Sequence, residues 1–221
     1  MKRMPFLVSI LASITIPALA VALDGHPTAG EAPFVSALSA DLQARFPTAD
    51  DAVKAGYLRF TNEDDTGAIS YANQQWTSQD PAHPSQLWYD VKGRLLGADY
   101  SVLQANSADP PHLWGVDPSR WTKFEAHVHY GLVGPDGTTT YKGTGAKTMS
   151  EAVASVEHPT ASALVTAGLA KSVSDVRFVF PFPAIWDLQV WAIPNPNGAF
   201  AEKNPNVIPA HTPRPTSNMS H

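Results

Sequence analysis

Residues 121–133 read WTKFEAHVHYGLV, a long run in which side chains of two kinds alternate. Side chains of a β-strand point alternately to the two faces of its sheet, so this pattern is typical of a strand. Residues 134–137, GPDG, predict a turn, and the β-branched residues within 138–144 predict a returning strand. The sequence therefore predicts an antiparallel hairpin over residues 121–144.

Shorter patterns on both sides of this hairpin predict further elements. Apolar residues at four-residue spacing predict a helix over 34–46, and capping-box patterns open two more. The full set consists of strands at 57–60, 69–71, 86–90, 94–102, 175–180 and 185–193, and helices at 34–46, 48–56, 148–157 and 159–170. Most links between strands are short, which favours antiparallel neighbours. We expect an α+β fold, a single domain built on an antiparallel β-sheet with a few short helices, over residues 32–208.

The first 20 residues predict a secretory signal peptide. Lys2 and Arg3 precede an apolar run, and Ala18-Leu19-Ala20 supplies the small residues that a signal peptidase reads. The run is shorter than the roughly 20 residues that a membrane span needs. We expect cleavage after Ala20 and a soluble mature protein in the periplasm or outside the cell. Residues 21–31 are expected to be a flexible leader, and residues 209–221 a disordered tail.

Composition narrows the classes of function. The chain has 15 Lys+Arg against 20 Asp+Glu, and removal of the signal peptide leaves 13 basic residues and a net charge of −7. A nucleic-acid-binding protein normally carries a basic surface, so we expect no nucleic-acid partner. The chain has no cysteine, which excludes disulfides, thiolate ligands and a thiol nucleophile. A small molecule, a metal ion or further copies of the chain in a homo-oligomer remain as partners.

Glu125, His127 and His129 form the main candidate site. They share one side of the predicted strand, opposite an apolar row, and the two imidazoles lie about 6–7 Å apart along the strand. Imidazole suits zinc, copper, iron or nickel, and Glu125 can add a ligand or orient a ring. The hypothesis is that His127 and His129 hold one divalent transition-metal ion such as zinc or copper. Two alternatives remain open: a polar pocket without a metal, and a solvated sheet face without a function.

Residues 185–191, IWDLQVW, form a second candidate. If this strand lies beside residues 121–132, Asp187, Gln189 and Trp191 join Glu125 as ligand-binding residues around the histidines. An ordinary half-buried strand explains the same pattern. His83 and His112 lie in proline-containing loops, from which a third metal ligand can come.

Two segments resemble a group of exported microbial proteins with no known activity. The first contains LWYD and GADY within residues 87–100, and the second contains DLQVW, NPNGAF and NPNV within residues 187–207. Members of that group often have a histidine at the position of Gln189. The glutamine weakens a metal site on this strand, so His127 and His129 must supply most of any site.

Three functions follow from these patterns. The first is an exported protein that binds a transition metal or a small polar ligand on the Glu/His strand face. The second is a metal-dependent periplasmic enzyme that keeps an open coordination position on the same face, although the sequence identifies no catalytic residue. The third is a structural or assembly protein without a site, in which the six tryptophans bury aromatic surface in a homo-oligomer.

Overall fold

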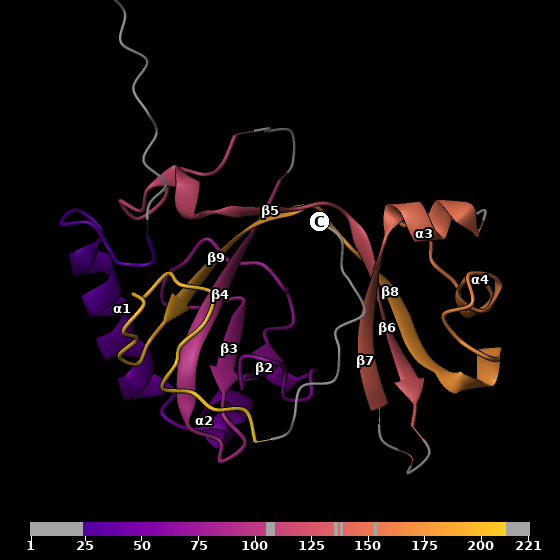
Figure 1. The fold of residues 1–221 in the computed structure, drawn as a ribbon, viewed down its shortest axis with the longest axis horizontal. Helices are drawn as coiled ribbons and strands as arrows, with labels where there is room; N and C mark the ends of the chain where they lie inside the picture. Colours follow the sequence, from indigo (N-terminus) through magenta and orange to yellow (C-terminus); the bar gives the residue numbers. More distant parts are fainter. Residues whose placement is uncertain (1–23, 105–108, 135–136, 138, 153, 211–221) are drawn as a thin grey trace, which may run out of the picture.

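A computed structural model describes residues 24–104, 109–134, 137, 139–152 and 154–210. The predicted signal peptide and residues 211–221 of the predicted tail lie outside the described residues. The described chain forms two antiparallel sheets with four short α-helices (Figure 1). The α+β class and the antiparallel strand pairing are therefore confirmed, although the strands divide between two sheets.

The six-stranded sheet has the order β1-β2-β3-β4-β9-β5 and the three-stranded sheet the order β7-β6-β8. The larger sheet consists of β1 (Leu58–Arg59), β2 (Ile69–Ala72), β3 (Gln86–Tyr89), β4 (Leu95–Leu103), β5 (Thr122–Phe124) and β9 (Ile185–Trp191), and the smaller of β6 (His127–Val133), β7 (Thr139–Gly145) and β8 (Val176–Phe182). The helices are α1 (Ala32–Arg45), α2 (Ala49–Lys54), α3 (Ala146–Glu151) and α4 (Ala161–Thr166), with 3-10 turns η1 (Pro118–Arg120) and η2 (Val173–Asp175).

The alternating run at residues 121–133 forms two strands that belong to different sheets. β5 pairs with β9 in the larger sheet, whereas β6 pairs with β7 and β8 in the smaller one. The chain changes sheets at Glu125 and Ala126. Trp121 is buried in the core beside the larger sheet, whereas Val128 is buried in the core of the smaller sheet. One continuous strand cannot reach both cores.

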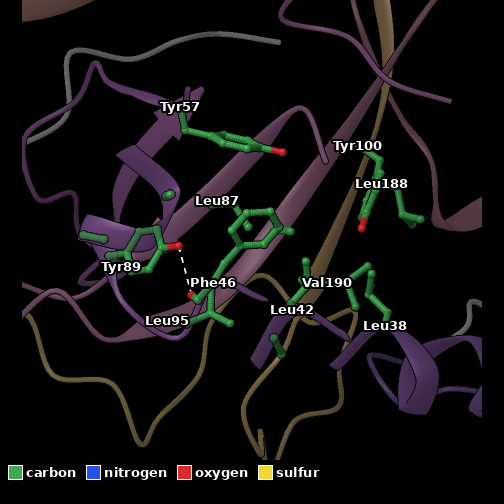
Figure 2. Close-up of a cluster of buried hydrophobic side chains, with 14 of the residues drawn as sticks. Leu38, Leu42, Phe46, Tyr57, Leu87, Tyr89, Leu95, Tyr100, Leu188 and Val190 are labelled. Carbon is green, nitrogen blue, oxygen red and sulfur yellow. Dashed lines mark hydrogen bonds between the residues drawn. The ribbon is translucent and has the colours of Figure 1, made fainter. Parts of the chain in front are cut away.

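The main core lies between the larger sheet and helices α1 and α2 (Figure 2). Leu38 and Leu42 of α1 are buried in it, as their four-residue spacing predicts. Leu188 and Val190 of β9 are also fully buried there. The hydroxyl of Tyr89 donates to the carbonyl oxygen of Phe46 at 3.1 Å, so this core satisfies its buried phenol.

A second core lies on one face of the smaller sheet. Val128 and Tyr130 of β6 pack there with Met149 of α3 and Leu164 of α4. In Figure 1 these two helices lie on the side of the smaller sheet that is turned away from the larger sheet. The opposite face of β6, which carries His127 and His129, is therefore turned towards the larger sheet.

Residues 24–31 differ from the expected flexible leader. The backbone N–H of Phe200 donates to the carbonyl oxygen of Gly25 at 2.9 Å, and Arg120 donates to the carbonyl oxygens of Asp24 and His26. Glu31 is only 1% exposed. The segment is fixed in place because two of its carbonyl oxygens accept hydrogen bonds from the buried guanidinium of Arg120. Within the described ranges, no helix has the length and apolar character required to cross a membrane.

Candidate functional site

His127 and His129 face each other on β6. Their Nε2 atoms are 2.7 Å apart and their ring centroids 4.6 Å apart. The backbone spacing alone would leave the rings farther apart, so both rings turn towards a common point. The structure therefore brings together the two residues that the sequence proposes as metal ligands.

The hydrogen bonds around the pair fix its tautomers. Nδ1 of His127 lies 2.7 Å from the carbonyl oxygen of Glu125, which can only accept, so His127 carries its proton on Nδ1. Its Nε2 is then an acceptor, and Nε2–H of His129 donates to it. Nδ1 of His129 is left as a bare acceptor. It is buried without a hydrogen-bond partner among the described residues.

Aromatic rings enclose the two imidazoles. Phe180 and Phe182 of β8 lie directly opposite His129 and His127 in the strand pairing, and Phe182 contacts both imidazoles at centroid distances of 5.0 and 4.7 Å. Tyr141 of β7 meets His129 edge-on at 5.1 Å. We call the following set the inter-sheet aromatic cluster: Phe60, Trp76, Tyr141, Phe178, Phe180 and Phe182.

Trp76 connects this cluster to the larger sheet through the loop after β2. Its ring contacts Phe60 at 4.9 Å and Phe180 at 5.5 Å. Its backbone has φ = 61°, a conformation that bulky residues rarely adopt. The side chain of Asn73 stabilises this turn by accepting from the backbone N–H of Trp76 at 2.7 Å. The backbone strain at Trp76 is offset by this hydrogen bond and by the contacts of its ring between the two sheets.

Burial keeps both imidazoles neutral. It lowers the pKa of His127, against a smaller raising effect of the hydrogen bond to the Glu125 carbonyl. Burial, together with the charge that His127 would carry, lowers the pKa of His129 to about 3. Neutral imidazole is the form that binds metal ions, so neither ring has to lose a proton to the solvent before it coordinates an ion.

A second polar atom of the cluster also lacks a partner. The hydroxyl oxygen of Tyr141 is buried and makes no hydrogen bond to the described residues, like Nδ1 of His129. Buried polar groups in native proteins are nearly always satisfied, so each one that is not requires an explanation. The site therefore presents an acceptor and a hydroxyl whose hydrogen-bonding capacity is unused.

Glu125 does not join the imidazoles. Its side chain is 72% exposed and forms an ion pair with Nζ of Lys123 at 2.6 Å. The residue lies in the crossover between β5 and β6, where the strand alternation that placed it beside the histidines is interrupted. Its contribution to the pair comes from its backbone carbonyl, which orients His127.

Asp187, Gln189 and Trp191 belong to the larger sheet and lie apart from the histidine pair. β9 pairs with β4 and with residues 122–124, so it borders only the first part of the run 121–132. Asp187 is buried beside Ser101, and Gln189 is exposed opposite Asp99. Trp191 packs against Trp88 and donates to the carbonyl oxygen of Ala201 at 2.7 Å.

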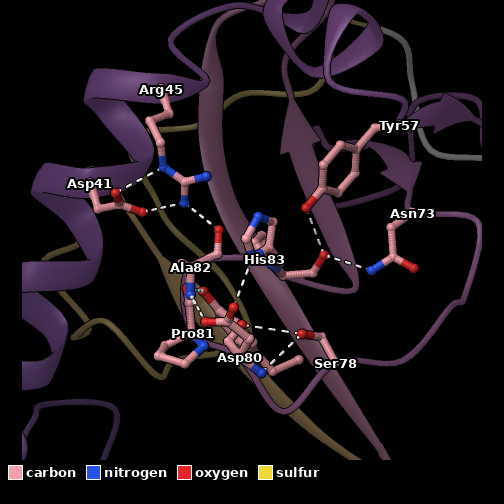
Figure 3. A network of polar contacts seen from close by, with 11 residues as sticks. Asp41, Arg45, Tyr57, Asn73, Ser78, Asp80, Pro81, Ala82 and His83 are labelled. Atoms are coloured by element: carbon pink, nitrogen blue, oxygen red, sulfur yellow. Dashed lines mark hydrogen bonds and ion pairs between the residues drawn. The ribbon is translucent and has the colours of Figure 1, made fainter.

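His83 and His112 supply no third ligand to the pair. His112 is exposed in the segment before η1. His83 pairs with Asp80 at 2.8 Å in the loop shown in Figure 3. An open cavity of about 630 Å³ lies along this loop, lined by Gln75, Thr77, Ser78, Gln79, Asp80, His83, Ser101, Val102 and Leu103. Five of these nine residues carry a hydroxyl or an amide group.

The histidine pair presents two imidazole rings whose Nε2 atoms face each other. Among the described residues, no group of three or more His, Cys, Asp or Glu side chains is arranged to hold an ion. His127 nevertheless has the feature that orients metal-binding histidines, which is a second ring nitrogen donating to a backbone carbonyl. Any further coordination positions would be filled by water or by a small ligand.

Sequence patterns did not reveal the aromatic partners of the histidines. Phe178, Phe180 and Phe182 alternate along one face of β8, which is the signal that places them together. Their position against β6 depends on strand pairing across about 50 residues of chain, which alternation alone does not specify.

No family model matches this chain, and comparison with curated proteins and with solved structures gives no match. The fold and the site therefore define only an antiparallel α+β protein with a paired-imidazole site between its two sheets.

Proposed function

We propose that the protein is an exported binding protein that holds one transition-metal ion between Nε2 of His127 and Nε2 of His129. The observation that carries this proposal is the 2.7 Å approach of these two nitrogens inside a ring of aromatic side chains. His127 already has the required tautomer, because its Nδ1–H is committed to the Glu125 carbonyl. His129 acquires the required tautomer when its proton moves from Nε2 to Nδ1, without a change of charge.

Ligand geometry requires a small rearrangement on binding. Metal–imidazole bonds are about 2.0–2.1 Å long, so two nitrogens on one tetrahedral ion are roughly 3.3 Å apart. The present separation of 2.7 Å must increase by rotation of one ring. Movement of the proton of His129 to Nδ1 removes the hydrogen bond that holds the nitrogens together, so the change of tautomer and the opening of the pair are coupled.

The surroundings favour copper in its monovalent form over zinc. Both ligands are neutral, and the carboxylate of Glu125 is turned away to Lys123. The desolvation free energy of an ion rises with the square of its charge, so it is about four times larger for a divalent ion than for a monovalent ion of the same size. The aromatic faces around the pair also attract a cation.

Metal titration of the mature chain and of matched variants tests the proposal. Wild type, H127Q, H129Q and the control H83Q would be titrated with Cu(I) under anaerobic conditions against a competing chelator, and separately with Zn(II). We expect about one equivalent of copper in wild type and H83Q, with tighter binding of Cu(I) than of Zn(II). H127Q and H129Q should bind copper with an affinity roughly tenfold or more below that of wild type. Equal copper affinity in all four proteins, or none in wild type, would contradict the proposal.

A small polar ligand is the second candidate, because the Tyr141 hydroxyl and Nδ1 of His129 lack partners among the described residues. Its signature would be a metal-independent ligand whose affinity falls in Y141F. Y141F removes one hydrogen-bonding group and leaves the ring contacts with His129 and Phe60 in place.

A further inference from the structure

Asp99 of β4 and Asp187 of β9 are two buried carboxyl groups on adjacent central strands of the larger sheet. In the strand register Asp187 lies opposite Ser101 and Asp99 lies opposite Gln189, so the two acids are diagonal neighbours on one face. Each residue is only 6% exposed. Two ionised carboxylates removed from water in this way would be costly, so the pair requires an explanation.

The hydrogen bonds of the pair leave one oxygen without a donor. The indole Nε1–H of Trp88 donates to Oδ2 of Asp99 at 2.9 Å, and the hydroxyl of Ser101 donates to Oδ1 of Asp187 at 2.8 Å. Oδ1 of Asp99 is buried, and no described residue donates a hydrogen bond to it. The two carboxyl groups are close enough to affect each other's pKa, and a proton held between them would give Oδ1 of Asp99 a partner. A hydrogen bond between two carboxyls requires that one of them carries a proton.

We infer that Asp99 and Asp187 share one proton in the folded protein, with Oδ1–H of Asp99 donating to the Asp187 carboxylate. The fold then becomes less stable in alkaline solution, because this proton is lost there. The proton accounts for the otherwise unpaired Oδ1. It also joins β4 to β9 through side chains, in addition to the backbone ladder between them.

The neighbouring groups support a retained proton. β3 places Gln86 opposite Asp99, and β5 places Thr122 opposite Asp187, so the facing positions are uncharged. Asp64, from the loop before β2, adds a negative charge that raises the pKa of Asp99 further. These neighbours provide hydrogen bonds or repulsion, and none of them provides a positive charge.

The direction of the pH effect follows from the raised pKa values. Burial raises the pKa of both carboxyls, and the charge of Asp187 raises that of Asp99 further. For Asp187 the pKa rises from 3.8 to about 7. A raised folded-state pKa stabilises the fold fully below the unfolded value and loses this effect as pH rises through the folded value. The contribution of Asp187 is thus complete near pH 4 and is lost as pH rises through about 7, and the raised pKa of Asp99 acts in the same direction.

Denaturation between pH 7 and 8.5 tests the inference, because unperturbed histidines, with a pKa of about 6.5, are mostly neutral in that range. Metal-free wild type, D99N, D187N and the control D80N would be unfolded with urea at several pH values. The side-chain amide introduced in D99N can donate to Asp187 and accept from Trp88, so it imitates the protonated acid. We expect the folding equilibrium constant of wild type and D80N to fall by up to about tenfold per pH unit, and that of D99N and D187N, which each keep one buried acid, to fall less steeply.

Proton uptake on refolding provides a readout that needs no variant. Wild type refolded at pH 7.5 in weak buffer should take up about one proton per chain. A level wild-type profile with no proton uptake would overturn the inference. A D99N profile as steep as that of wild type would overturn it as well.

Discussion

The ring of Phe182 stacks on the ring of His129, with centroids 4.7 Å apart and planes inclined by 12°. Phe182 lies opposite His127 in the pairing of β6 with β8, so one phenyl ring covers both imidazoles. This stacking removes the histidines from water and keeps them neutral. It also places two nitrogen lone-pair positions in an apolar environment, where a metal–ligand bond competes with little solvent.

Acid should destabilise the fold through His129. Its pKa of about 3 lies below the ordinary 6.5, so its stabilising effect is present above pH 6.5 and is lost as pH falls towards 3. H129F keeps a ring in the cluster and cannot be protonated. We expect the melting temperature of metal-free H129F to fall less than that of wild type between pH 7 and pH 4.5. An equal fall in both proteins would show that His129 does not bind the proton on unfolding.

The backbone of Trp76 should be strained, whereas the contacts of its ring should stabilise the fold. W76A removes ring contacts with Phe60, Phe180 and Phe182, and we expect a loss of about 2–3 kcal/mol in unfolding free energy. W76G loses the same contacts but adopts positive φ without strain, so it should be about 1 kcal/mol more stable than W76A. Urea denaturation of both variants measures this difference. W76A equal to or more stable than W76G would argue against the strained turn.

The buried ion pair between Glu31 and Arg120 should be essential for the packing of residues 24–31. The nitrogen and oxygen are 3.1 Å apart, and the side chains are only 1% and 5% exposed. Although burial opposes it, hydrogen bonds from Arg120 and from two backbone N–H groups lower the pKa of Glu31 to about 2. R120M leaves the carboxylate buried without its cation, and we expect a loss of about 3–5 kcal/mol in unfolding free energy.

The pair of Arg94 with Asp90, in which the arginine side chain is 71% exposed, provides the control for that measurement. R94M should lower the unfolding free energy by less than about 1 kcal/mol, because solvent reaches the arginine and screens its charge. Similar losses in R120M and R94M would mean that the Glu31 pair is no more important than a surface contact.

Local patterns predicted those parts of the fold that depend on neighbouring residues. The spacing of Leu38 and Leu42 predicted α1, and the turn at residues 134–137 predicted the pairing of β6 with β7. The order β4-β9-β5 could not be predicted, because it joins segments far apart in the chain. The change of sheet at Glu125 could not be predicted either. The alternating pattern continues through this residue, although the side chains on its two sides are buried in different cores.

The candidate site was predicted in part for the same reason. His127 and His129 are two residues apart on one strand, so their shared face followed from alternation alone. The aromatic cover from Phe182 and Trp76 depends on how two sheets pack, and the sequence carries no local signal for that packing. The proton-sharing pair of Asp99 and Asp187 depends on the register of β4 with β9, which is likewise non-local.

X-ray absorption spectroscopy of the copper-loaded mature chain identifies the atoms that bind the metal. We expect Cu(I) to have two imidazole nitrogens as its protein ligands, and this signature to be kept in H83Q and lost in H129Q. A copper environment without imidazole scattering, or an identical spectrum in H129Q, would contradict a metal site at His127 and His129.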